Sequence, residues 1–153
     1  MKIVEGDVAD PRVAAMLRAY IESIHAQTEH TAHLLDLVDY RPPRVTLWAA
    51  WDGEALLGIA ALRALSPEHG EIKSMHTAEV ARRRGVGGAL LRHIADAAKA
   101  RGMTRLSLET GSWDFFRPAI ALYRKFGFVD CPPYRGADTD PRNRFMTMEL
   151  GGE

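Results

Sequence analysis

The chain is poor in several features that mark particular protein classes. It has one cysteine, Cys131, among 153 residues, which excludes an internal disulfide and fits a reducing compartment. Its 20 basic and 20 acidic residues balance, so no global field attracts nucleic acid or an anionic membrane. No apolar run is long enough to span a membrane, and no basic-plus-apolar leader follows Met1. We therefore expect a cytoplasmic protein with no membrane or nucleic-acid partner, in which any anion site is local.

Neither an internal repeat nor a Gly/Ser-rich linker divides the chain, so we expect residues 1–153 to form a single domain. At this length a core can be buried without metal or disulfide staples. Three histidines, His25, His30 and His33, lie close together in the sequence with Glu29 between them. Their spacing fits no common zinc pattern, so we expect no bound metal.

The alternation of apolar residues with turn signals predicts both strands and helices. A helix is expected to begin after Asp10-Pro11, which supply a cap and a first helical position. Asp52-Gly53 is a strong hairpin signal, and we place another turn at 67–70. The expected strands cover residues 2–4, 45–51, 56–65, 71–77, 105–109, 128–131 and 145–150, and further helices cover 33–38, 85–101 and 118–126. This order predicts an α/β (α+β) protein with a mixed sheet and helices on both faces.

The stretch from Arg82 to Gly88, Arg-Arg-Arg-Gly-Val-Gly-Gly, lies between an expected strand and an expected helix. The strand ends at Thr77, and apolar residues recur at helical spacing from Val86 to Ala97. The first amides of a helix lack an intrahelical acceptor, the helix dipole adds positive potential there, and glycines let a ligand approach the backbone. The loop therefore predicts a site for a pyrophosphate.

Two familiar glycine motifs do not fit this loop. A dinucleotide-binding Gly-x-Gly-x-x-Gly that starts at Gly85 would need a glycine where Leu90 stands, and a P-loop would need Gly-Lys-Ser/Thr, which the chain lacks. A nucleic-acid site built on the three arginines is a further hypothesis, but no aromatic residues are interleaved with them for base stacking. Arginines beside a glycine-rich backbone suit the phosphates of a coenzyme better.

Two segments of the chain carry a resemblance to a known family. Arg82, Gly85 and Gly87 match the pattern Arg/Gln-x-x-Gly-x-Gly/Ala, and residues 119–128 form a later Ala-x-x-Leu-Tyr-x-x-x-Gly-Phe block. Together they resemble the GCN5-related N-acetyltransferase (GNAT) family, specifically over residues 71–128 and loosely elsewhere. The resemblance implies the GNAT acyl-CoA N-acyltransferase fold, with a mixed, mostly antiparallel central sheet flanked by helices on both faces, and acetyl-CoA as the cosubstrate.

The resemblance also implies which residues bind acetyl-CoA. Backbone groups at the end of the strand before the loop would pair with the pantetheine amides, and one amide would stabilise the oxyanion formed on the thioester carbonyl. Where many family members carry an asparagine, this chain has Phe116, for which two interpretations stay open: it covers the pantetheine with apolar surface, or it is a packing residue. The predicted binding residues are Met75, His76, Thr77, Arg82, Arg83, Arg84, Gly85, Val86, Gly87, Gly88, Phe116 and Tyr123.

Acetyl transfer to an amine needs a base, because an alkylamine with a pKa near ~10 is mostly protonated at neutral pH. Glu71 is the first candidate, since by the resemblance it stands where histone-type members carry their catalytic glutamate. Glu109, at the end of the neighbouring strand, is the second, and it would border the cleft if the two strands splay apart to admit the pantetheine arm. The alternative for Glu71 is an ion pair with a surface cation.

Tyr123 lies, by the resemblance, where the family's general acid protonates the departing coenzyme A thiolate. A phenol with a reference pKa near ~10 is protonated at neutral pH. Periodicity alone favours a core tyrosine packed beside Phe126 and Phe128. For Cys131 an acyl-accepting role is a weaker hypothesis than a small buried residue, because no partner base is evident in the sequence. We therefore expect direct transfer.

The expected activity is acetyl-CoA-dependent N-acetylation of an amine of a small molecule or a peptide. The alternative is a coenzyme A-binding sensor or regulatory module without turnover. Residues 25–43 and 132–143 are expected to select the acceptor, because they are the least regular segments beside the proposed site. Edge strands near the C-terminus favour a homodimer.

Overall fold

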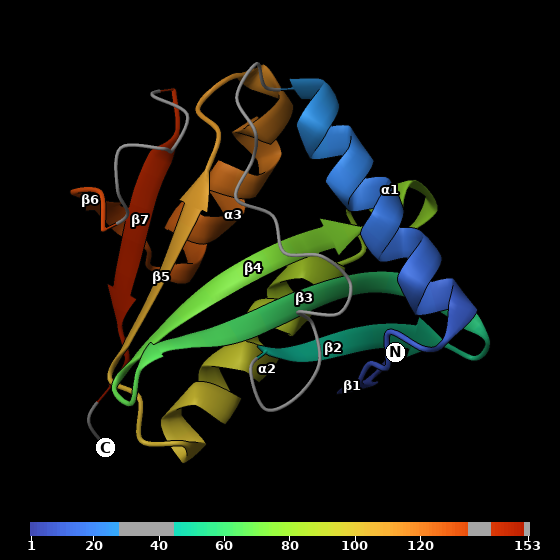
Figure 1. The fold of residues 1–153 in the computed structure, drawn as a ribbon, viewed down its shortest axis with the longest axis horizontal. Coiled ribbons are helices and arrows are strands. Elements are labelled where there is room, and N and C mark those ends of the chain that lie inside the picture. The colour runs from blue at the N-terminus through green and yellow to red at the C-terminus, as the bar shows by residue number, and fades with distance from the viewer. Residues whose placement is uncertain (28–44, 135–141, 152–153) are drawn as a thin grey trace.

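A mixed sheet organises the chain in the computed structural model, which describes residues 1–27, 45–134 and 142–151. Its strands lie in the order β1-β2-β3-β4-β5-β7-β6 (Figure 1). Only β4 and β5 pair in parallel among the described strands, and the other neighbours are antiparallel, as predicted. The strands are β1 (Lys2–Glu5), β2 (Val45–Asp52), β3 (Ala55–Ser66), β4 (His69–Thr77), β5 (Arg105–Thr110), β6 (Val129–Cys131) and β7 (Arg144–Glu149).

Helices cover both faces of this sheet, which confirms the expected layering. The helix α1 (Pro11–Gln27) crosses one face, and α2 (Val86–Ala100) and α3 (Arg117–Phe126) lie on the other (Figure 1). Two short 3-10 turns, η2 (Glu79–Ala81) and η3 (Asp114–Phe116), precede α2 and α3. The helix expected over residues 33–38 lies outside the described residues.

The two cores follow from the apolar run in β2, whose successive side chains point to opposite faces. Leu47 faces the α1 side and packs in one cluster with Leu17. Trp48 faces the other side and packs in a second cluster with Leu90. All four side chains are at most 4% exposed, so the sheet is buried on both faces in its centre.

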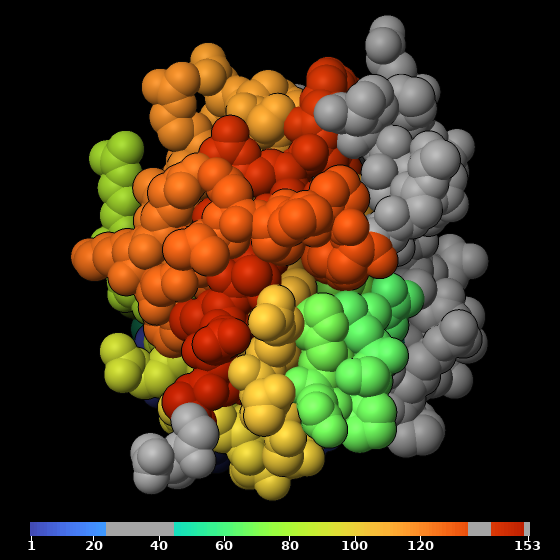
Figure 2. Space-filling view, turned by 90° about the vertical axis from the view of Figure 1, so that its left-hand side faces the viewer, coloured from blue at the N-terminus to red at the C-terminus, as the bar shows by residue number. Residues whose placement is uncertain are grey.

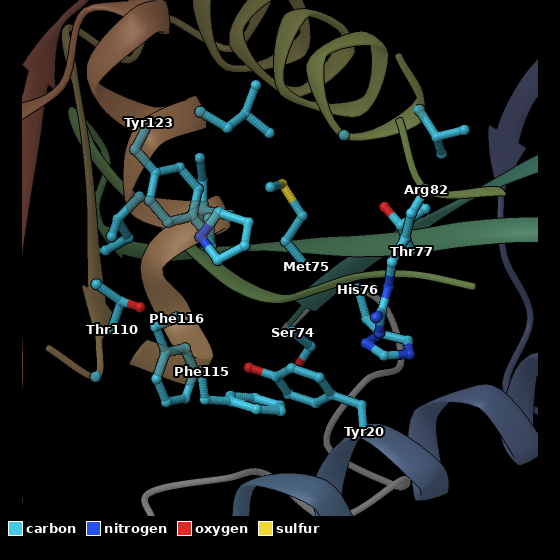
Figure 3. A pocket seen from close by; sticks show the side chains of 18 of the residues that line it. Tyr20, Ser74, Met75, His76, Thr77, Arg82, Thr110, Phe115, Phe116 and Tyr123 are labelled. Carbon is cyan, nitrogen blue, oxygen red and sulfur yellow. The ribbon is translucent and has the colours of Figure 1, made fainter. Parts of the chain in front are cut away.

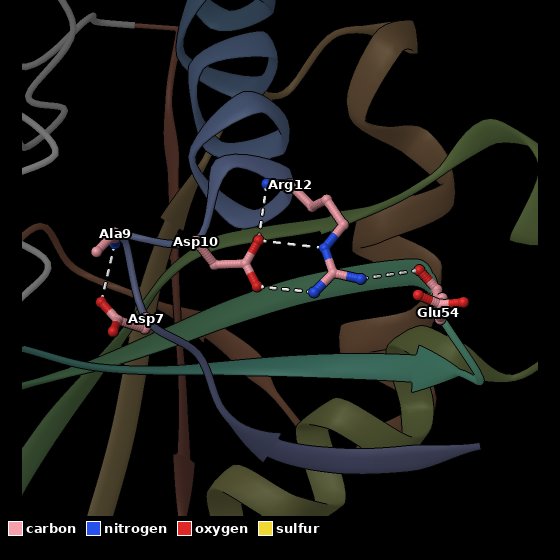
Figure 4. Close-up of polar contacts among 5 residues, drawn as sticks. All are labelled: Asp7, Ala9, Asp10, Arg12 and Glu54. Carbon is pink, nitrogen blue, oxygen red and sulfur yellow. Dashed lines mark hydrogen bonds and ion pairs between the residues drawn. The ribbon is translucent and has the colours of Figure 1, made fainter.

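The start of α1 is fixed by the Asp10-Pro11 pair, as expected. Asp10 Oδ1 accepts a hydrogen bond from the backbone N–H of Arg12 at 2.8 Å, and the side chain of Arg12 donates back to the same carboxylate (Figure 4). These hydrogen bonds lower the pKa of Asp10. Arg12 also reaches the Glu54 carbonyl and lies over the Trp51 ring, which attaches the beginning of α1 to the β2–β3 hairpin.

The turn expected at residues 67–70 is shorter than predicted. Ser66 already pairs with His69, so only two residues connect β3 and β4, and β4 starts two residues before the predicted strand. Gly70 is part of the sheet rather than of the turn. A Cβ on Gly70 would lie 2.8 Å from Leu62 Cδ1 and 2.8 Å from Met103 Sδ, so the glycine permits close packing under the strand.

Two irregularities in β4 open the sheet in its middle. The parallel pairing with β5 ends at Glu71 and Ser107, so the two strands part beyond that point, as the sequence analysis expected. Between Lys73 and His76, β4 has one residue more than the facing stretch of β3, and Ser74 in this bulge has φ +56°. The sheet therefore has an opening at its centre, bordered by a bulged strand.

Candidate functional site

A pocket of about 770 Å³ occupies the opening between β4 and β5. Side chains from α1, β4, β5, η3 and α3 surround it, together with the first turn of α2 (Figure 3). Elements far apart in the sequence therefore meet at one concavity, the usual form of a small-molecule site.

The N-terminus of α2 borders the pocket with free backbone amides. Gly85 is the N-cap residue with φ +80°, and none of the described side chains caps the helix. Gly85, Val86, Gly87 and Gly88 all line the pocket. The first N–H groups of a helix and its dipole attract an anion, so this corner of the pocket can hold phosphate groups.

The three arginines of the loop separate into two groups. Arg82 and Arg83 line the pocket, on the side where α2 begins. The side chain of Arg84 is 54% exposed and forms an ion pair with Asp52 at 3.7 Å, at the β2–β3 turn. Two of the three predicted cationic side chains are thus brought to the pocket, and that of Arg84 is directed elsewhere.

The bulged end of β4 supplies another wall. Met75, His76 and Thr77, all predicted binding residues, line the pocket. Burial, and secondarily the charge of Arg82, lower the pKa of His76, so its imidazole is neutral at neutral pH. The His76 ring lies 5.7 Å from the ring of Tyr20, which reaches the same pocket from α1 (Figure 3).

Tyr123 on α3 is both a core residue and a pocket residue. Its side chain is 7% exposed, and its ring centre lies 5.9 Å from that of Phe128. It also lines the pocket (Figure 3). Burial raises the pKa of Tyr123 to about 12, so the phenol is protonated at neutral pH. Tyr123 thus packs in the core, as periodicity indicated, and also reaches the pocket, while its role as an acid stays a prediction.

Phe116 lines the pocket at the start of α3. Its ring packs edge-on against Trp113 and Phe115, with ring centres 4.9 Å apart in both pairs. Gly111 makes this possible, because a Cβ there would clash with the Phe116 ring. Apolar rings therefore line this wall of the pocket, and the covering of a pantetheine by Phe116 stays a prediction.

The two candidate carboxylates lie in different surroundings. Glu109 lines the pocket, and Asn143 Nδ2 donates a hydrogen bond to its Oε2 at 2.6 Å. Glu71 is 1% exposed and does not line the pocket. Its oxygens accept hydrogen bonds from Arg63 Nη2 and Tyr134 Oη, each at 2.8 Å. The structure therefore brings Glu109 and Tyr123 to one cavity and places Glu71 in a buried polar cluster beside it.

Several polar pocket residues were not singled out by the sequence analysis, among them Tyr20, Ser23 and Lys73. Tyr20 lies on α1 and Lys73 on β4. Nothing local distinguishes them, because their role depends on which elements pack around the opening. Asn143 comes from the predicted acceptor loop, of which residues 135–141 lie outside the described part.

Other hypotheses from the sequence can be placed as well. Cys131 lies on β6, outside the pocket lining, and burial raises the pKa of its thiol. In the described parts of the chain, no three His, Cys, Asp or Glu side chains are grouped as metal ligands would be. Among the same residues, no helix has the length and apolar character needed to cross a bilayer. Of the clustered histidines His25, His30 and His33, only His25 lies within a described element, the helix α1.

The chain belongs to the GNAT acetyltransferase family, whose model matches residues 11–128, and it is an acyltransferase. It is 43% identical over 145 residues to the uncharacterized N-acetyltransferase YedL of Escherichia coli, covering 94% of this chain and 91% of that protein. To the uncharacterized N-acetyltransferase YsnE of Bacillus subtilis it is 40% identical over 151 residues, covering 98% and 100%.

A solved structure shows the same fold. A GNAT family acetyltransferase from Elizabethkingia anophelis, with acetyl-CoA bound, superposes with a TM-score of 0.71 at 22% sequence identity. The match covers 97% of each chain. The predicted fold class is thereby confirmed.

Proposed function

We propose that this protein transfers an acetyl group from acetyl-CoA directly to an amine of a small molecule or a peptide. The observation that carries the proposal is the pocket between β4 and β5, where the α2 amides, Glu109 and Tyr123 meet. Family membership supports the reaction class. Two further relatives are named IAA acetyltransferase and streptothricin acetyltransferase, which supports a small-molecule acceptor.

The residues of the pocket fit acetyl-CoA. Its diphosphate and 3′-phosphate are anionic, and they would be held by the amides of residues 85–88 with Arg82 and Arg83. The parted strands leave an opening for an extended arm, with Phe116 as apolar cover. When bound, acetyl-CoA supplies the activated acetyl group.

Arg82→Ala is expected to weaken coenzyme A binding by roughly tenfold or more, the loss of one charge-assisted hydrogen bond to phosphate. Arg84→Ala is the matched control, because its side chain pairs with Asp52 and not with the pocket. Isothermal titration calorimetry at two salt concentrations would measure the affinity of both variants for coenzyme A. Equal losses in the two variants would contradict the proposed division among the arginines.

Glu109 is the base in this proposal. It lines the pocket, and the hydrogen bond from Asn143 fixes the orientation of its carboxylate. An acceptor ammonium that enters the pocket can give its proton to this group and become nucleophilic. Glu71 instead neutralises the cations beside the pocket.

Tyr123 is the acid. Its pKa of about 12 keeps the proton available for the leaving thiolate. Tyr123→Phe should lower kcat by roughly 10²-fold with little change in the affinity for acetyl-CoA, because the ring remains and only the donor is lost. Steady-state kinetics and coenzyme A titration separate the two effects. Because the raised pKa lies far above neutrality, the wild-type rate should show no alkaline decline from Tyr123 below about pH 11.

An acceptor screen that reads free thiol from acetyl-CoA tests the function. It is paired with the thermal shift that coenzyme A produces, since binding to the folded state raises the melting temperature. Thiol release with an amine supports the enzyme. A large thermal shift with no thiol from a broad amine panel would favour the coenzyme A sensor instead.

We also propose a single domain over residues 1–153, a cytoplasmic location and a homodimer. The described strands all belong to one hydrogen-bonded sheet, which supports one domain. At one end of the sheet, β6 and β7 lie at the surface (Figure 2), and Val129 on β6 is 59% exposed. An open strand edge can pair with a second copy.

A further inference from the structure

The pocket between β4 and β5 is lined by helices from both faces of the sheet. The first turn of α2 and residues of α3 line it from one face, and Tyr20 and Ser23 of α1 line it from the other (Figure 1). The proposed function places the phosphates of acetyl-CoA at the α2 end. The end of the pocket near α1 is therefore the place for the acceptor.

An exposed aromatic ring, Phe115, lies in the pocket. Of the large apolar side chains that are exposed in the described part of the chain, only Phe115, at 48%, lines the pocket. Figure 3 shows its ring in the same part of the pocket as Tyr20, with Tyr123 nearer to α2. Removing such a ring from water against an apolar group of a ligand is favourable.

Neighbouring rings hold Phe115 in place. Its ring packs edge-on against Phe116, with ring centres 4.9 Å apart and an angle of 80° between the planes. Phe116 packs in the same manner against Trp113, and the guanidinium of Arg142 lies 4.2 Å from the centre of the Trp113 ring. Because these contacts order the ring before any ligand enters, they reduce the entropy cost of binding.

A second pair of rings borders the same end of the pocket. Tyr20 on α1 and His76 on β4 both line it, and their ring centres lie 5.7 Å apart. Burial lowers the pKa of His76, so this ring is neutral at neutral pH. Aromatic rings from α1, β4 and η3 thus surround the space beside Phe115.

We propose that the acceptor is an arylalkylamine, whose aromatic ring lies against Phe115 with Tyr20 on the opposite wall. This inference rests on the proposed function. Glu109 lines the same pocket, so the carboxylate and the rings bind the two ends of one molecule. Offset and edge-to-face contacts between rings are favourable beyond the apolar area that they bury, which favours an aromatic over an aliphatic group. A small or polar amine would leave the Phe115 ring in water.

Matched acceptors test the inference. Thiol release from acetyl-CoA is measured with benzylamine, 2-phenylethylamine, tyramine and tryptamine, with ethylamine and 2-cyclohexylethylamine as comparisons, and with a panel of polar amines. The best arylalkylamine should have a kcat/KM roughly 10²-fold above ethylamine, from burial of the ring, and about threefold or more above 2-cyclohexylethylamine, from ring contacts.

The outcomes separate the inference from the function on which it rests. Equal use of the aryl and cyclohexyl amines, or a higher kcat/KM with amines that carry no ring, would overturn the inference and leave the acetyltransferase function standing. If no amine of any kind releases thiol, the proposed function is overturned as well.

A variant of the exposed ring assigns the contact. Phe115→Ala should reduce the preference for the arylalkylamine over ethylamine by roughly tenfold, mainly through KM, and Phe115→Tyr should keep it because the ring remains. Leu65→Ala is the matched control, since Leu65 is an exposed apolar residue outside the pocket lining, and it should leave the preference unchanged. If Phe115→Ala is unstable, Phe115→Leu removes the ring and keeps an apolar side chain. A preference equal to that of the wild type in the variants without the ring would contradict the assignment.

Discussion

Glu109→Gln is expected to lower kcat for acetyl transfer by about 10²- to 10⁴-fold, the usual contribution of a positioned general base. Glutamine keeps the size of the side chain and cannot take the proton of the acceptor. The coenzyme A site proposed at the α2 N-terminus is untouched, so the thermal shift with coenzyme A should stay within error of the wild type. Initial rates with saturating acetyl-CoA measure the change.

Glu68→Gln is a suitable control, because Glu68 is exposed in the β3–β4 turn, away from the pocket. It should change neither rate nor binding. The proposal for Glu109 fails if Glu109→Gln keeps more than a tenth of the wild-type kcat with the same acceptor.

Glu71→Gln is expected to destabilise the fold by roughly 3 kcal/mol, the lower end of the cost of removing one member of a buried ion pair. The carboxylate is 1% exposed and pairs with Arg63 and Lys73, whose side chains are 22% and 9% exposed. The neutral amide leaves two largely buried cations without this partner. Denaturant titration gives the change in the free energy of unfolding, and the slope of the titration should stay the same.

The same variant discriminates between the two carboxylates. With Glu109 as base, Glu71→Gln at a temperature where it remains folded should keep a measurable kcat and lose mainly stability. An unfolding free energy equal to that of the wild type, together with a kcat reduced 10²-fold or more, would instead return Glu71 to the role of base.

Local patterns predicted much of the fold and several residues that the structure brings to the α2 end of the pocket. The apolar run of β2 and the Asp52-Gly53 turn determine a buried hairpin from adjacent residues alone. The glycines at the start of α2 are also a local signal, since a helix start is a local structure. The block that contains Tyr123 likewise consists of residues adjacent in the sequence. Expected strand and helix boundaries accordingly agree with the structure within two residues over the described part.

Local patterns could not decide which of the two candidate glutamates, Glu71 or Glu109, lies in the pocket. Glu71 differs from Glu109 through its partners, and one of them, Tyr134, lies 63 residues away in the sequence. Glu109 depends on Asn143, 34 residues away on the approach to β7. Neither contact follows from local spacing, because each requires the register of the strands and the point at which β4 and β5 part. Gly70 was assigned to a turn for a related reason: its close packing partner, Met103, comes from a distant connection.

The central claim is that the opening between β4 and β5 holds acetyl-CoA, with its diphosphate on the first amides of α2. A crystal structure of the protein with coenzyme A tests this most directly. The account predicts density for the diphosphate within hydrogen-bond distance of the N–H groups of residues 86–88, and for the pantetheine arm between Met75 and Phe116. An empty opening, with coenzyme A bound at another surface, would contradict it.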